Sequence, residues 1–178
     1  MTLETDRIIE RVGERAEALY RGGGMLCAEA VLTALNQEFA GGLPAEQISG
    51  LAAGFAMGLG EAGCLCGALS GGVMGLGLLL GAGGPLDHGR VARRAARRLH
   101  QAFKETEGST CCRVLSSKVK HDKKVHFEQC AGITGRTARA AARVLLEERP
   151  RLAAASNGEP LRAVGAGGLG RLWRRSRS

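Results

Sequence analysis

Six cysteines are the residues of this 178-residue chain best suited to chemistry. They occupy four separate places along the sequence, at Cys27, at Cys64 and Cys66, at Cys111 and Cys112, and at Cys130. A cysteine thiolate is both a nucleophile and a ligand for iron or zinc. No two of the cysteines form a CxxC pair and no CxxCH is present, which argues against a zinc ribbon, a thioredoxin-like motif and covalent haem attachment.

Three of the four places are predicted to lie at or near helix starts. Cys27 and Cys66 are expected where helices begin, and Cys130 just before another helix. At such positions, exposed backbone N–H groups and the positive end of the helix dipole stabilise a thiolate. The glycine-rich run that follows Cys66 leaves space for a cluster or a partner sulfur. These positions therefore favour metal binding or thiol chemistry.

Geometry separates the members of each cysteine pair. On a helix, Cys64 and Cys66 would point about 200° apart, so both can serve one site only if their segment is a loop. Cys111 and Cys112 have Cα atoms about 3.8 Å apart, which is closer than an unstrained disulfide allows. We expect only one residue of each pair to bind a metal or react, and the spacing leaves open which one.

The elements that must position these cysteines are predicted to be helices. Apolar periodicity indicates helices over 4–21, 27–39, from about 44, within 62–85, from 87 to about 107 and over 134–149, with a short helix at 113–119. Aromatic residues make up only 3% of the chain, which favours close helix packing over a β-sandwich. We predict a single compact bundle of five or six helices over residues 1–149, followed by a disordered basic tail over 150–178.

Residues 62–85 carry no charge and are long enough to cross a bilayer. Gly63, Gly67, Gly71 and Gly75 recur every four residues and predict a stripe along which another helix packs closely. The absence of flanking aromatic residues and of a second span favours a buried central helix over membrane insertion.

Charge gives little support for nucleic-acid binding. The net charge is +8, of which residues 151–178 contribute +5 through six Arg and one Glu. The arginines expected on one helix face have no interleaved aromatic residues, so a solvated surface is favoured over a specific nucleic-acid site; they are Arg90, Arg93, Arg94, Arg97 and Arg98. The first 21 residues contain no unbroken apolar run typical of a signal peptide, so we expect a reducing cytoplasm, where cysteines more often bind metals or react than form structural bridges.

The segment Cys66–Gly71 reads CGAxxG, and it is preceded by Cys27 and followed by Cys111, Cys112, Arg113 and Cys130. In these features the chain resembles the C_GCAxxG_C_C family of redox-active proteins over about residues 21–148. The resemblance implies that the ligands are Cys27, Cys66, Cys112 and Cys130, with Gly67 beside them. Cys112 is preferred to its neighbour because the family pattern places Arg directly after the cysteine. Cys64 and Cys111 depart from the pattern and could be spare thiols, a resolving partner or exchanged ligands.

The resemblance implies a redox function, and four cysteine ligands would suit an iron–sulfur cluster that transfers electrons. A similar domain in split-Soret cytochromes is associated with a non-haem iron–sulfur centre. The implied partner is an electron donor or acceptor protein, with ligands that could be shared across a homodimer. The pattern leaves open whether the protein is an oxidoreductase or an electron carrier.

Three alternatives remain. The same cysteines could perform thiol–disulfide exchange, assisted by the lysines over 118–124. A structural or sensing zinc site could combine His126 with Cys130 and with Cys111 or Cys112. The cysteines could also simply fill a helical core.

Overall fold

The computed structural model describes residues 2–81 and 87–156. Over these residues the chain is helical without strands, and six α-helices have eight or more residues, as predicted. These are α1 (Leu3–Arg21), α2 (Cys27–Glu38), α3 (Ala45–Ala52), α5 (Gly67–Gly81), α6 (Asp87–Glu107) and α8 (Lys123–Glu148). Shorter turns are α4 (Ala56–Leu59), α7 (Cys112–Leu115) and the 3-10 helices η1 (Ala53–Phe55) and η2 (Pro150–Ala155).

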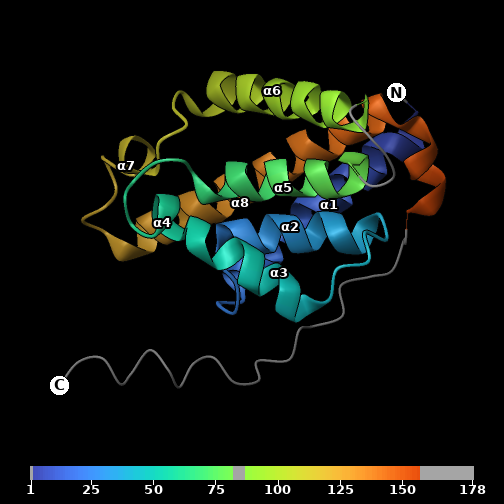
Figure 1. Cartoon of the computed structure of the whole chain (residues 1–178). Coiled ribbons are helices and arrows are strands. Elements are labelled where there is room, and N and C mark those ends of the chain that lie inside the picture. The colour runs from blue at the N-terminus through green and yellow to red at the C-terminus, as the bar shows by residue number, and fades with distance from the viewer. Residues whose placement is uncertain (1, 82–86, 157–178) are drawn as a thin grey trace.

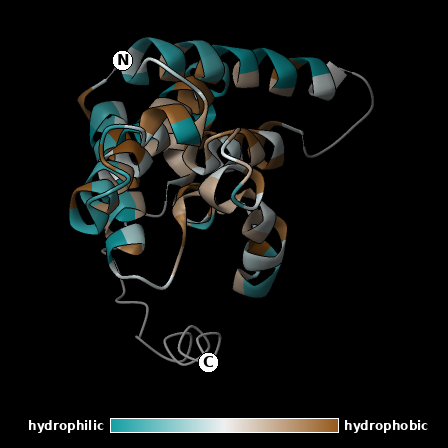
Figure 2. Cartoon of the chain, turned by 90° about the vertical axis from the view of Figure 1, so that its left-hand side faces the viewer, coloured by the Kyte–Doolittle hydropathy of each residue, from teal (hydrophilic) through white to brown (hydrophobic). Residues whose placement is uncertain are grey.

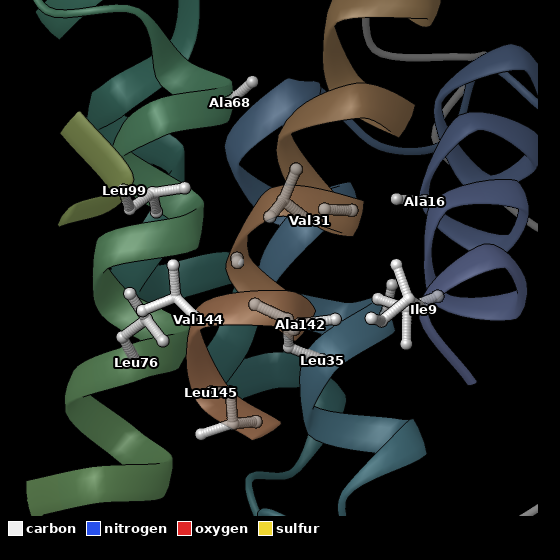
Figure 3. Close-up of a cluster of buried hydrophobic side chains, with 14 of the residues drawn as sticks. Ile9, Ala16, Val31, Leu35, Ala68, Leu76, Leu99, Ala142, Val144 and Leu145 are labelled. Atoms are coloured by element: carbon white, nitrogen blue, oxygen red, sulfur yellow. The ribbon is translucent and has the colours of Figure 1, made fainter. Parts of the chain in front are cut away.

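Helices α5 and α8 form the middle of the bundle. Helix α5 contacts α2, α6 and α8, and α8 contacts α1, α2, α5 and α6 (Figure 1). Apolar side chains from these five helices meet in one core, among them Ile9, Val31, Leu76, Leu99 and Leu145 (Figure 3). Figure 2 shows the hydrophilic residues concentrated on the outer sides of the helices.

The glycine stripe of α5 allows α2 to approach closely. A Cβ atom on Gly71 would lie 2.4 Å from the carbonyl oxygen of Ala28, and one on Gly75 would lie 2.4 Å from Cδ1 of Leu35. The predicted buried central helix is therefore confirmed. Gly63 does not extend the stripe, because it precedes α5 and packs against the side chain of Arg113.

The last long helix begins at Lys123, much earlier than the predicted start at 134. Asp122 caps it, since its carboxylate accepts hydrogen bonds from the backbone N–H groups of Lys124 and Val125. Its first turns are held by contacts with other elements, such as the stacking of Phe127 on Tyr20, with ring centroids 5.1 Å apart. Cys130 therefore lies inside α8, and the expectation that it precedes a helix is wrong.

The arginine face of α6 is partly neutralised by α8. Arg94 forms an ion pair with Glu148, and Arg98 pairs with Glu147 and Glu148. Arg93 and Arg97 are exposed. This arrangement agrees with a solvated, ion-paired surface.

The packed body extends past the predicted boundary at residue 149. The 3-10 helix η2 contacts α8 and α1, and the hydroxyl of Ser156 hydrogen-bonds to the carboxylate of Glu38. Because these contacts fix residues 150–156, the expected start of the tail at 150 is too early; the remainder of that predicted tail lies outside the described residues. Among the helices in the described ranges, none combines the length and the apolar character needed to span a membrane.

Candidate functional site

Four free cysteines line one pocket at the end of the bundle where α4 and α7 lie (Figure 1). They are Cys27, Cys66, Cys112 and Cys130, and each comes from a different segment of the chain. Apolar side chains complete most of the wall, including Ala68, Leu115 and Ile133. The four cysteines that the resemblance implied are thus gathered in one place.

Cys27 and Cys66 face each other from the starts of two neighbouring helices. Cys27 is the first residue of α2, and the preceding N–H group, on Leu26, is capped by the side chain of Glu29 at 2.8 Å. Cys66 immediately precedes α5, and its sulfur accepts hydrogen bonds from the backbone N–H groups of Ala68 and Leu69. The prediction that both cysteines lie at helix starts is confirmed.

The glycines of the CGAxxG segment explain how these two helix starts can meet. A Cβ atom on Gly67 would lie 2.6 Å from the sulfur of Cys27 and 2.8 Å from the carbonyl oxygen of Phe55. Four residues later, Gly71 lets the backbone of α2 contact α5 directly at Ala28. The motif therefore provides space for the Cys27 sulfur beside Cys66.

Cys112 and Cys130 form the other side of the pocket. Cys112 is the first residue of the short helix α7, and Cys130, in α8, lines the same pocket. The two elements are joined where the side-chain amide of Gln129 donates a hydrogen bond to the carbonyl oxygen of Leu115, at 2.7 Å. This contact holds Cys112 near α8.

Cys64 and Cys111 form a disulfide with each other. The bond joins the loop before α5 to the loop before α7, which are also paired through their backbones. The N–H group of Cys66 donates to the carbonyl oxygen of Thr110 at 2.8 Å, and that of Arg113 donates to the carbonyl oxygen of Gly63 at 2.9 Å. Cys64 lies in a loop and not on a helix, and in this state neither Cys64 nor Cys111 offers a thiolate ligand.

Burial makes the four pocket thiols weak acids. It raises the pKa of Cys27 to about 12, with further contributions from the neighbouring cysteines. Burial likewise raises the pKa of Cys66 to about 11, although the N–H groups at the start of α5 act in the opposite direction. The pKa values of Cys112 and Cys130 are raised by the same cause. The thiols are therefore protonated near neutral pH unless a cation replaces the protons.

Tyr20 is a site residue that the sequence analysis missed. Its hydroxyl donates a hydrogen bond to the sulfur of Cys130, and its own pKa is raised by burial and by the nearby thiols of Cys130 and Cys27. The sequence indicated only that Tyr20 belongs to the helix predicted over 4–21. The available signal was that the one tyrosine of the chain lies on this helix, shortly before Cys27.

Replacing Tyr20 with phenylalanine is expected to slow alkylation of Cys130 about fivefold in the reduced, metal-free protein, because a hydrogen bond of about 1 kcal/mol to the thiolate is lost. The hydrogen bond lowers the pKa of Cys130, so its removal leaves less thiolate at a given pH. Labelling of each cysteine over a pH series, followed by mass spectrometry, measures the effect. Phe127→Leu is the control, since it removes the stacked ring and keeps the hydroxyl. Equal labelling of Cys130 in the wild-type and Tyr20→Phe proteins would contradict the assigned hydrogen bond.

The described residues contain no group of three or more Cys, His, Asp or Glu side chains arranged to hold a single metal ion. His126 is not among the residues that line the pocket. The four sulfurs share a pocket without converging on one point.

Comparisons with known proteins agree with the composition of the site. Searches of curated proteins and of solved structures found no match. A family model described as "Putative redox-active protein (C_GCAxxG_C_C)" matches residues 25–144, a range that contains the disulfide and all four free cysteines. This match covers well over half of the chain, so the protein belongs to the C_GCAxxG_C_C family.

Proposed function

We propose that Cys27, Cys66, Cys112 and Cys130 bind an iron–sulfur cluster and that the protein transfers electrons. One observation carries this proposal: four thiols that form no disulfide, from four different elements, line the same small apolar pocket. Iron–sulfur clusters are held by cysteine thiolates, commonly four of them. When bound, such a cluster accepts and releases electrons one at a time.

The surroundings of the sulfurs support this assignment. Reduction potentials of iron–sulfur sites depend on hydrogen bonds to sulfur, on burial and on the apolar shell. Here the N–H groups of Ala68 and Leu69 bond to the sulfur of Cys66, and the hydroxyl of Tyr20 bonds to the sulfur of Cys130. Bound iron would also offset the cost of forming thiolates in an apolar pocket.

Gly67 has a supporting role in the proposed site. Its missing side chain leaves the space occupied by the Cys27 sulfur, and its helix start provides the N–H donors next to Cys66. Gly67 would therefore keep two of the four ligands within reach of one cluster.

Anaerobic purification followed by iron and labile-sulfide analysis and a visible spectrum tests the proposal. We expect a coloured protein with stoichiometric iron and sulfide, and we expect Cys66→Ser to lose at least half of both, because serine removes a thiolate ligand. The matched control is Cys64→Ser with Cys111→Ser, which removes two cysteines next to the site but none of the proposed ligands. A colourless wild-type protein, or equal losses in both variants, would contradict the cluster assignment.

Thiol–disulfide exchange is the second candidate, and the Cys64–Cys111 bond favours it. In such a reaction a thiolate attacks a disulfide sulfur, forms a mixed disulfide and displaces the other sulfur as a thiolate. Cys66 and Cys112 are close in sequence to the bonded pair, but burial keeps their thiols protonated. A colourless protein whose thiols cycle reversibly between the reduced and the disulfide form would favour this function. Bound zinc would favour a structural or sensing site.

A further inference from the structure

We propose that the surface around the mouth of the cysteine pocket docks an acidic electron-transfer protein. This mouth surface consists of exposed apolar residues Leu26, Met57, Leu59, Val114, Val125 and Phe127 and of the cations Arg113, Lys118, Lys120, Lys123 and Lys124. The inference rests on the proposed redox function, since a docked partner would exchange electrons with the group in the pocket.

Exposed apolar side chains are concentrated at this end of the bundle. Six of the eight large apolar side chains that are exposed among the described residues belong to the mouth surface, with exposed fractions between 36% and 55%. Their segments are those that build the site. Leu26 precedes Cys27, Val114 follows Cys112, and the Met57–Leu59 turn contacts α7. Exposed apolar patches of this kind mark interaction sites in soluble proteins.

Positive charge surrounds these apolar residues. Residues 113–124 contain five Lys or Arg residues and one acidic residue, Asp122, which caps α8. Glu128 is neutralised by its ion pair with Arg21, whereas Glu29, next to the start of α2, accepts a hydrogen bond from Ser49 and keeps its negative charge. Glu61, on the loop after α4, remains exposed. The mouth surface is therefore cationic with an apolar component.

The segment that carries these cations is also a wall of the pocket. Residues 113–124 include the pocket residues Leu115 and Ser116 and lead into α8, which contributes Gln129 and Cys130 to the same pocket. A protein that covers them comes close to the four sulfurs. Figure 2 looks onto this end of the molecule.

Charge and position decide which kind of partner the mouth surface binds. A second copy of the chain, docked symmetrically, would place the same cations opposite each other, and like charges across an interface are costly. An anionic lipid surface would match the charge but contains no group that accepts an electron. An acidic electron-transfer protein matches the charge and also uses the adjacent pocket.

The test uses a small acidic [2Fe–2S] ferredoxin as the probe and the full-length protein purified anaerobically. Binding is measured by isothermal titration calorimetry at low and at physiological ionic strength. We expect Lys120→Gln with Lys124→Gln to weaken binding about tenfold at low ionic strength and to reduce its salt dependence. The matched control is Arg93→Gln with Arg97→Gln, which removes the same charge from exposed positions on α6 and should change binding less than about twofold. Val114→Ser should weaken binding without altering the salt dependence, because it changes only apolar contact.

Several results would overturn the docking proposal. These are equal effects of the two double variants, no binding of the ferredoxin, binding of phosphatidylglycerol vesicles instead, and self-association that depends on the mouth lysines. Iron, sulfide and thiols are assayed on the same samples. Weak binding by a variant that retains its cofactor supports the docking surface, whereas a colourless protein that still binds the probe supports docking and counts only against the cluster.

Discussion

Replacing Gly71 with alanine is expected to lower the free energy of unfolding by about 3 kcal/mol, because it overpacks a contact between two backbones. The added Cβ atom would lie 2.4 Å from the carbonyl oxygen and 2.9 Å from the Cα atom of Ala28. Neither atom can move aside without moving α2. Because Cys27 adjoins Ala28, the displacement should also separate the sulfurs of Cys27 and Cys66.

Gly77→Ala is the matched control for this prediction. Gly77 lies on the same helix, and a Cβ atom there would meet nothing within 4 Å. Alanine should therefore raise the free energy of unfolding by about 0.5 to 1 kcal/mol through its better helix propensity. Urea denaturation followed by circular dichroism measures both variants. Equal effects of the two substitutions would mean that the close approach of α2 and α5 does not limit stability.

Replacing Glu38 with glutamine is expected to destabilise the protein by about 4 kcal/mol, since it removes a buried negative charge beside Arg15, which is buried, and Arg11, which is partly buried. The side chain of Glu38 is completely buried at the end of α2. Its carboxylate accepts hydrogen bonds from the guanidinium of Arg11 and from the hydroxyl of Ser156, and Nη1 of Arg15 lies 3.7 Å away. This group connects α1, α2 and the segment after α8. Glu10→Gln is the control, because the Glu10 carboxylate, which pairs with Arg139, is 58% exposed whereas that of Glu38 is fully buried, so the pair should contribute less than about 1 kcal/mol.

The contribution of Glu38 should depend on pH. Burial acts to raise the pKa of Glu38, but the hydrogen bonds from Arg11 and Ser156 outweigh it, so the pKa lies below its usual value. A carboxylate with a lowered pKa in the folded state stabilises the protein fully above the unfolded-state pKa, about 4.3 for Glu, and loses this contribution as the pH falls through the folded-state pKa. The difference in unfolding free energy between wild type and Glu38→Gln should therefore be constant near pH 7 and shrink below about pH 4. A difference that does not change down to pH 2 would exclude this ionisation as the cause.

Much of the fold was predictable because its determinants are local. Apolar periodicity and the glycine stops placed α1, α2 and the start of α3 within a few residues of their observed positions. The spacing of Gly67, Gly71 and Gly75 predicted close packing of the central helix. The start of α8 was not predictable in this way. Its first turns are polar, and they are held by the Asp122 cap and by contacts of Phe127 and Gln129 with other elements.

The gathering of the four cysteines was predictable, whereas the contacts of the side chains around them were not. Resemblance to the family implied Cys27, Cys66, Cys112 and Cys130, which share one pocket. The pairing of the other two cysteines depends on how two distant loops meet, which spacing cannot specify. The contact of Tyr20 with Cys130 likewise requires the approach of α1 and α8.

The Cys64–Cys111 bond joins residues 47 positions apart, and the loop that it closes contains α5 and α6. Loop-closure models assign such a crosslink about 4 kcal/mol, because it removes conformational entropy from the unfolded chain. That amount is comparable to the whole stability of many small domains, about 5 to 15 kcal/mol. The oxidation state of the surroundings would thus also determine how long the chain survives heat and proteases.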